Sequence, residues 1–133
     1  MTSRIAVLAI DARDPRRVAD FWCSVLGWAV LEESADVVSI GPPGSGSGAA
    51  PLTIDVAGVP EPKTGKNRLH LDLRADGTSQ EAEVARALAL GARRVDVGQG
   101  PDVSWVVLAD PEGNEFCLLQ RTVQEAAQGE AAG

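Results

Sequence analysis

The stretch that decides the fold spans residues 5–30 and reads IAVLAIDARDPRRVADFWCSVLGWAV. Its first six residues are all apolar, which predicts a short buried strand over Ile5–Ile10. Asp14 and Pro15 then provide a helix start, because an Asp side chain can accept hydrogen bonds from unpaired backbone N–H groups and Pro suits the first helical position. Apolar residues recur at helical spacing after this start, and Gly27 can end the helix in a left-handed cap.

Strand-like segments follow the helix, and a loop and a linker separate them from the second half of the chain. The three predicted strands are Ala29–Leu31, Val37–Ile40 and Leu52–Val56. The stretch GPPGSGSGAA at residues 41–50 has no apolar anchor and is predicted to be a flexible loop. Residues 57–67 contain prolines at two positions and are predicted to be a linker.

The second half repeats the same order of elements. Leu69–Leu73 has the alternation of a strand, Thr78 and Glu81 fit a capping box, and the following helix is predicted to end at Gly91. The last predicted strands are Arg94–Val97, Trp105–Leu108 and Phe116–Leu119. A strand, a helix and three strands therefore occur twice, which predicts an α+β fold of two βαβββ modules.

The boundaries of the modules follow from this order of elements. Module one covers about residues 4–56 and module two covers about residues 68–120, and both belong to one domain over residues 1–122. The remaining residues, 123–133, are rich in Ala, Gln, Glu and Gly and are predicted to form a disordered tail.

Composition narrows the class of protein. The chain has 133 residues, of which 44% are hydrophobic, and this is enough for one domain with its own core. Its net charge of -7 argues against nucleic acid as a partner, because an acidic surface repels phosphate. No apolar run approaches the roughly 20 residues that span a bilayer, and no signal peptide is recognisable. Cys23 and Cys117 are expected to be free thiols in a cytoplasmic protein.

Strand alternation sorts the polar residues of the second module onto one face. Leu69, Leu71 and Leu73 share a face that is predicted to pack on a helix. His70 and Asp72 share the opposite face. This polar face either lines a cavity or meets water, as antiparallel sheets allow.

Three motifs resemble the glyoxalase/bleomycin-resistance/dioxygenase superfamily. DARDPRRVADFWCSVLGW at 11–28 resembles its first strand–helix unit, RLHLDL at 68–73 resembles the strand that opens its second module, and DPEGNEFCLL at 110–119 resembles its terminal hairpin. Together with VPEPKTGKNR at 59–68, they are similar to an actinobacterial subgroup of glyoxalase-like proteins. The resemblance covers about residues 4–120 and implies paired βαβββ modules that form a cupped mixed sheet with helices on the outside, often as a dimer.

The resemblance also implies a set of metal-ligand positions, because metalloenzymes of the family bind a divalent ion through His, Glu or Gln side chains from four strands. These positions fall at Val7, at His70, at Cys117 and at Asp55 or Thr53. Val7 cannot bind a metal, so His70 is the only retained ligand of the family type and no metal is expected. The alternative is a divalent ion (zinc, manganese or nickel), and a site of Asp55, His70 and Cys117 would favour zinc.

His70 is the first candidate for chemistry. It is either a proton shuttle, because histidine titrates near neutrality, or a structural residue that is hydrogen-bonded to a carboxylate. Asp72 lies two residues along the same face, about 6.5–7 Å away at the rise of a strand, which is too far for an ideal direct hydrogen bond. Cys117 is either a nucleophile or an inert buried thiol.

Other residues also have both a functional and a structural interpretation. Trp105 either lines the rim of the cavity or belongs to the core. Asp11 either approaches the cavity or starts a turn. The basic cluster of Lys63, Lys66 and Arg68 either holds an anionic group of a ligand or forms a solvated linker.

Three functions are consistent with the sequence. The first, which the degenerate metal positions favour, is a homodimeric protein that binds a small organic molecule in the cavity, with Asp55, His70, Asp72, Trp105 and Cys117 as ligand-binding residues. The second is a lyase or isomerase that uses His70 as acid and base or as part of a divalent metal site. The third is a structural dimeric domain that has lost its ligand. Neither nucleic acid nor a membrane is expected as a partner.

Overall fold

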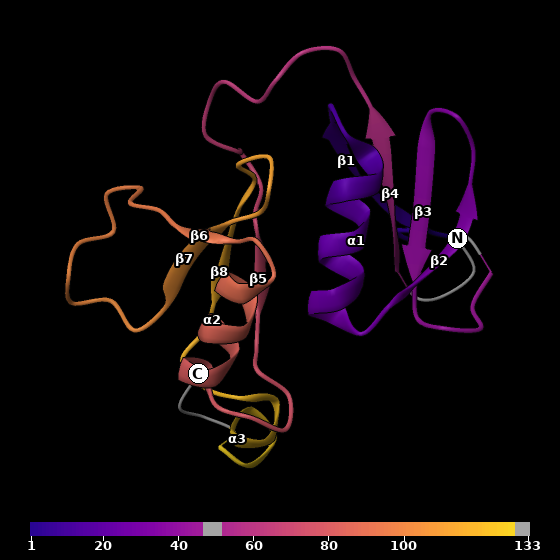
Figure 1. The fold of residues 1–133 in the computed structure, drawn as a ribbon. Helices are drawn as coiled ribbons and strands as arrows, with labels where there is room; N and C mark the ends of the chain where they lie inside the picture. Colours follow the sequence, from indigo (N-terminus) through magenta and orange to yellow (C-terminus); the bar gives the residue numbers. More distant parts are fainter. Residues whose placement is uncertain (47–51, 130–133) are drawn as a thin grey trace. The chain divides into compact units, whose positions relative to one another are not determined.

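The computed structural model describes residues 1–46 and 52–129, so residues 47–50 of the loop predicted at 41–50 lie outside the described residues. The chain divides into two compact units, Met1–Thr64 and Gly65–Gly133. Each unit contains one four-stranded mixed sheet with a helix on one of its faces (Figure 1). The α+β fold of two βαβββ units predicted from the sequence is therefore confirmed.

The first unit contains five elements that follow the predicted order. They are β1 Val7–Ala12, α1 Pro15–Leu26, β2 Ala29–Glu33, β3 Val37–Gly41 and β4 Thr53–Gly58. The strands lie in the order β1-β4-β3-β2, with β1 parallel to β4 and the other neighbours antiparallel. Because β4 runs to Gly58, it includes the first two residues of the segment predicted as a linker.

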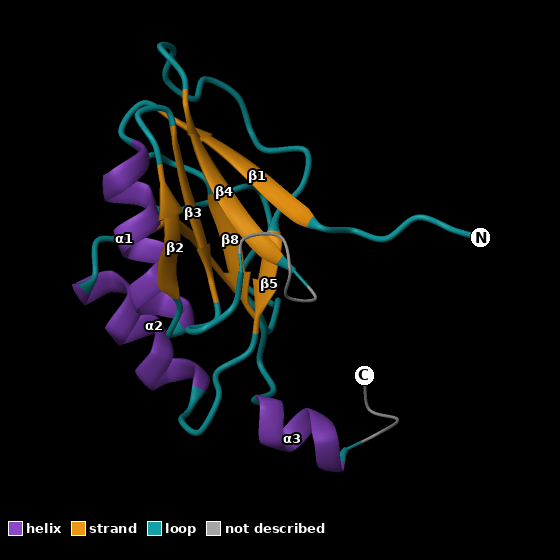
Figure 2. Ribbon diagram, turned by 90° about the vertical axis from the view of Figure 1, so that its right-hand side faces the viewer, coloured by secondary structure: helices purple, strands orange, loops and turns teal. Residues whose placement is uncertain are grey.

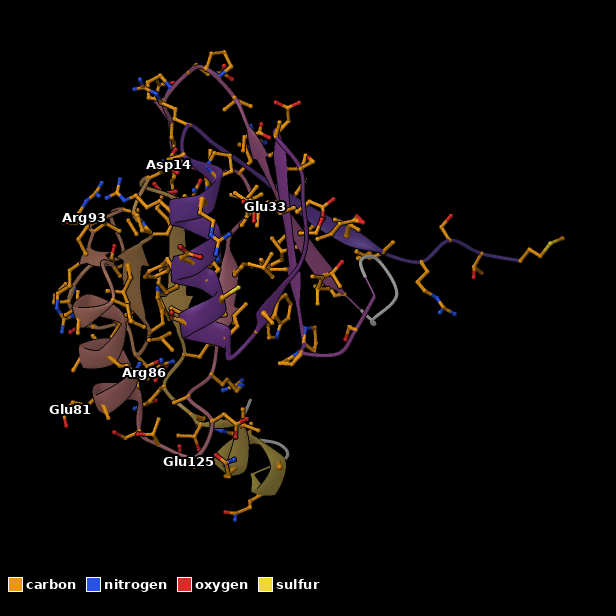
Figure 3. All side chains as sticks on the ribbon, turned by 45° about the vertical axis from the view of Figure 1, so that its right-hand side comes forward. Asp14, Glu33, Glu81, Arg86, Arg93 and Glu125 are labelled. Carbon is orange, nitrogen blue, oxygen red and sulfur yellow. The ribbon has the colours of Figure 1, made fainter. Side chains whose placement is uncertain are left out.

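Residues at its two ends determine where helix α1 begins and ends. The Asp14 side chain accepts a hydrogen bond from the backbone N–H of Arg17 at 3.2 Å, and Asp14 lies at the start of the helix (Figure 3). Gly27 ends the helix with a φ of 69°, the left-handed region that glycine enters without steric cost. The buried residues Val18 and Trp22 lie on one side of α1, which runs along one face of its sheet (Figure 2).

Strand β1 differs from the prediction of a strand buried on both faces. It begins two residues later, at Val7, and its residues alternate between more and less exposed positions. Ile5 lies outside the strand with an exposed side chain. The reason is that α1 covers only one face of the sheet, so the side chains of Val7 and Asp11 on the other face stay exposed.

The second unit repeats the arrangement around a shorter set of strands. Its elements are β5 Leu71–Leu73, α2 Gln80–Ala89, β6 Arg93–Arg94, β7 Val106–Ala109, β8 Glu115–Leu118 and α3 Val123–Gln128. The strands lie in the order β5-β8-β7-β6, and β5 is parallel to β8. On the helix side of this sheet, Phe116 and Leu118 are buried, as are Val84 and Ala87 of α2.

Two details of this unit correct the sequence-based expectations. Leu69 lies before β5 and is 79% exposed, so it does not pack on the helix as predicted. The alternation of apolar residues in the sequence extends back to Leu69, but the pairing with β8 begins only at Leu71. Helix α2 is capped by Ser79, whose hydroxyl accepts from the N–H of Ala82 at 3.0 Å, rather than by a capping box that begins at Thr78.

The segment after the last strand forms helix α3 instead of the disordered tail that its composition suggested. Its capping box joins the hydroxyl of Thr122 to the N–H of Glu125 and the carboxylate of Glu125 to the N–H of Thr122. Gln124 also donates a hydrogen bond to Asp76 at 2.7 Å. Residues 130–133 lie outside the described residues. Among the helices of the described ranges, none has the length and apolar character to cross a membrane.

Candidate functional site

The turn between β7 and β8 fixes the frame of the site. Asp110 is fully buried, and its carboxylate accepts hydrogen bonds from the backbone N–H groups of Glu112 and Asn114, at 2.9 and 3.0 Å, and from the Asn114 side chain. A buried carboxylate is stable only with such partners. The turn therefore holds β7 and β8 in one register, which pairs Val107 with Cys117.

The parallel ladder between β5 and β8 brings two polar residues together. Asp72 pairs with Cys117. The residues before and after them also form pairs, Leu71 with Phe116 and Leu73 with Leu118, and these side chains point to the helix side. Paired residues on neighbouring strands lie about 4.8 Å apart across the ladder. The side chains of Asp72 and Cys117 therefore lie beside each other on the sheet face opposite α2.

His70 joins this pair through a direct hydrogen bond. Its Nδ1 atom lies 2.8 Å from Oδ1 of Asp72, so the prediction that the two residues are too far apart is wrong. The prediction assumed the regular rise of a strand, whereas β5 begins only at Leu71 and leaves the backbone of His70 outside the ladder. The side chains of His70 and Asp72 are each 44% exposed, so this module does not enclose them.

Three metal-ligand types converge at this point. One potential ligand atom from each of His70, Asp72 and Cys117 lies within 4.8 Å of the other two. Cys117 is the buried member of the group, at 8% exposure. Burial raises the pKa of the Cys117 thiol, and the Asp72 carboxylate raises this pKa further by charge repulsion and by hydrogen bonding. The thiol is therefore held in its protonated form, which argues against a free nucleophile.

The chain segment before His70 is anchored to the same strand. The backbone N–H of Asn67 donates to the Glu115 carboxylate at 2.9 Å, and the Asn67 side chain donates to the side-chain oxygen of Asn114 at 3.3 Å. Lys66 lies near enough to Cys117 to lower the pKa of its thiol, against the larger effects of burial and Asp72. Lys66 thus places a positive charge beside the cluster, whereas Arg68 is exposed and Lys63 belongs to the first unit.

Asp55, the fourth candidate, lies in β4 of the first unit. Its carboxylate accepts a hydrogen bond from the hydroxyl of Ser39 at 2.7 Å, because β3 and β4 pair these two residues directly. Thr53, the alternative at this position, is completely buried. Within the second unit, the group that converges on Cys117 contains Asp72.

The structure also places the remaining candidates. Trp105 lies immediately before β7 and is 40% exposed, so it is not a core residue, whereas Trp22 is buried. Asp11 does not start a turn, because it lies within β1 and pairs with Ala57. Sequence reasoning had missed the direct partnership of Asp72 with His70 and the anchoring role of Asn67. The sequence His70-Leu71-Asp72 shows the spacing of the two residues, but it does not show that β5 begins only at Leu71.

The residues do not fit the four-strand metal centre that the family resemblance implies. The first-strand position is Val7, whose side chain has no donor atom, and the last-strand position is a thiol in place of a carboxylate. The chemistry of the donor set, rather than its geometry, rules out that centre. The local cluster in the second unit is a different set of ligands.

Comparison with known proteins supports the assignment of the fold. The sequence model of the glyoxalase-like domain matches residues 7–119, which is most of the chain. A search of curated proteins gave no match. Among solved structures, a glyoxalase/bleomycin resistance protein/dioxygenase family enzyme from Burkholderia phytofirmans has a TM-score of 0.61 and 21% identity, over 87% of this chain and 97% of that one.

Two further structures have different roles on the same fold. TnmS3, an antibiotic binding protein from a Streptomyces species, has a TM-score of 0.58 and 21% identity, over 91% of this chain and 98% of that one. The fosfomycin resistance protein FosX from Listeria monocytogenes, a mutant complexed with Mn(II) and a dihydroxypropylphosphonic acid, has a TM-score of 0.66 and 14% identity, over 97% and 98%. Likeness at such identities reflects the fold alone. Since the domain match nevertheless spans both βαβββ units, this chain belongs to the glyoxalase-like domain family.

Proposed function

We propose that the protein binds a small organic molecule on the polar face of the sheet in its second unit, at His70, Asp72 and Cys117. The observation that carries this proposal is the convergence of the three side chains within 4.8 Å, on the face that α2 leaves uncovered. Binding sites combine a few polar groups with apolar surroundings. Here the buried Val107 pairs with Cys117 across the ladder and supplies an apolar neighbour.

The loss of the four-strand metal positions supports a binding role over the metal-dependent chemistry of the family. Val7 and Cys117 stand where metalloenzymes of the family carry ligands. TnmS3 is an antibiotic binding protein on this fold, so a ligand of antibiotic-like size suits the architecture. We also propose that the protein is a cytoplasmic homodimer, as the family resemblance implies, and sedimentation of the full chain tests the dimer.

A thermal-shift screen of small organic molecules, antibiotics included, tests the binding role. A ligand at 100 times its Kd should raise the free energy of unfolding by about 2.7 kcal/mol. The shift should persist with a chelator and disappear in Asp72→Ala. The matched control is Glu81→Gln, an exposed residue of α2 in the same unit (Figure 3), which should keep the shift. A ligand shift that Asp72→Ala leaves intact would place the binding site elsewhere.

The second candidate is a lyase or isomerase in which His70 acts as acid and base. The observation that favours it is the hydrogen bond of Nδ1 to Asp72, because it orients the imidazole and leaves Nε2 available for proton transfer. For any compound found to bind, His70→Gln should then lower the turnover rate by a much larger factor than it weakens binding. A compound that binds unchanged in the wild-type protein, with no product over hours, would leave only the binding role.

A further inference from the structure

We propose that His70, Asp72 and Cys117 together bind one zinc ion through ligands of the second unit alone. The inference rests on the proposed function, because it names a metal at the same site. It goes beyond the four-strand centre of the family, which draws its ligands from both βαβββ units and fails here at Val7.

The spacing of the three side chains suits a single ion. Ligand atoms on a tetrahedral zinc lie roughly 3.5 Å from one another, given bond lengths of about 2.0–2.3 Å. The three atoms here lie within 4.8 Å of one another. Closing this difference takes about 1 Å of side-chain movement, which the half-exposed His70 and Asp72 can make by rotation.

The backbone holds two of the ligands in place before any metal arrives. Asp72 and Cys117 are paired across the parallel ladder, and the buried turn at Asp110 fixes the strand that carries Cys117. The hydrogen bond between His70 and Asp72 shows that the imidazole already turns toward the carboxylate. The chain therefore loses little conformational entropy on binding, which favours affinity.

The identity of the ligands selects the metal. A thiolate and an imidazole favour zinc over magnesium or manganese, which prefer oxygen ligands. The thiolate of Cys117 and the carboxylate of Asp72 together neutralise the two charges of the ion. Three protein ligands leave a fourth position open, and the exposure of His70 and Asp72 puts that position toward solvent. Water would occupy it.

Metal titration of the full chain tests the proposal. The chelator-treated protein should bind one zinc per chain in calorimetry, and cobalt should give the near-ultraviolet charge-transfer absorption of a thiolate–cobalt bond. Cys117→Ser should lose this absorption and weaken zinc binding by more than about tenfold. Cys23→Ser is the matched control, because Cys23 lies on α1 of the other unit, and it should keep both signals.

If Cys117→Ser fails to fold, two other variants, Asp72→Asn and His70→Ala, still test the zinc site. Both residues are half-exposed, so circular dichroism should show folded variants, and both should weaken zinc binding by more than about tenfold. Absence of saturable zinc binding by the wild-type chain, or equal zinc affinity in the folded variants, overturns the proposal.

The zinc site and the proposed function fail in different ways. If the zinc titration is flat but an organic molecule still raises the melting temperature in the presence of a chelator, the zinc site is wrong and the binding role stands. If zinc binds at one per chain but no organic molecule in the screen changes the melting temperature, the zinc site stands and the binding role is wrong.

Discussion

The imidazole Nδ1 atom of His70 lies 2.8 Å from the Oδ1 atom of Asp72, although the two residues are separated by only Leu71. This contact exists because the hydrogen-bonded part of β5 begins after His70. A carboxylate at neutral pH can only accept a hydrogen bond, so the imidazole proton must lie on Nδ1 when the ring is neutral. The bare Nε2 atom then becomes the basic nitrogen that the site offers.

We predict that Asp72 sets the tautomer of His70. At a pH at which the imidazole is neutral, nitrogen NMR of the wild-type protein should show the proton mainly on Nδ1. Asp72→Leu removes the acceptor, so the proton should move toward Nε2, the form that free histidine prefers. Because the pair is half-exposed, either Asp72→Leu or Asp72→Asn should change the free energy of unfolding by less than about 1 kcal/mol. Identical ring-nitrogen shifts in wild type and Asp72→Leu would contradict the hydrogen bond.

Asp110 should be among the most costly residues to replace in the second unit. Its buried carboxylate accepts from Glu112 and from the backbone and side chain of Asn114, so Asp110→Ala removes the acceptor that these part-buried donors share. We expect a loss of roughly 3 kcal/mol or more in the free energy of unfolding, measured by urea denaturation. Asp110→Asn keeps one carbonyl oxygen and should lose less.

The control for this comparison is Asp102→Ala, which replaces an exposed aspartate in the loop before β7. Surface substitutions of this kind change stability by less than about 0.5 kcal/mol. If the two alanine variants unfold at the same urea concentration, the turn at Asp110 does not hold the β7–β8 hairpin as described.

Both ends of helix α1 were predictable from the sequence. Asp14, Pro15 and Gly27 act on the backbone within a few residues of themselves, so the sequence alone locates both ends of α1. The capping box of α3 is equally local, and Thr122 followed by Glu125 could have predicted it. The Ala-, Gln-, Glu- and Gly-rich composition of the tail obscures this motif.

The candidate site was predictable only in part, and the reason is geometric. Alternation placed His70 and Asp72 on a polar face, since the alternation of side chains along one strand is a local property. Which residues approach each other across strands depends on where each ladder starts and on its register. The pairing of Asp72 with Cys117, and of Asp55 with Ser39, joins segments 45 and 16 positions apart, and no local pattern encodes it.

The backbone at Gly27 gives a prediction about helix termination. Its φ of 69° is unfavourable for a residue with a side chain, while a Cβ atom there would meet no atom of the described residues within 4 Å. Gly27→Ala should therefore lower the free energy of unfolding by about 1 kcal/mol through backbone strain alone. Gly65→Ala is the control, because a Cβ atom there also meets open space but the backbone is not left-handed. Equal thermal stability of the two variants would refute the role of the left-handed cap.

The final prediction concerns alkaline pH and the thiol of Cys23 on α1. Burial raises the pKa of this thiol above its ordinary value of 9.0, and the charge of Asp20 raises the pKa further. A raised pKa in the folded state means that the folded protein holds the thiol proton more tightly than the unfolded chain does. The resulting stabilisation is complete below the unfolded pKa and is lost as the pH rises through the folded pKa.

The melting temperature should therefore fall as the pH rises above about 9, and Cys23→Ala should make this fall less steep. Calorimetry at several pH values between neutrality and alkaline pH measures both slopes. Ser24→Ala, which changes the neighbouring exposed position of the same helix and leaves the thiol in place, should retain the wild-type slope. A raised pKa in the folded state can only make stability fall as the pH rises through it. If the melting temperature of Cys23→Ala fell with pH as steeply as that of the wild type, burial on α1 would therefore not raise the pKa of this thiol.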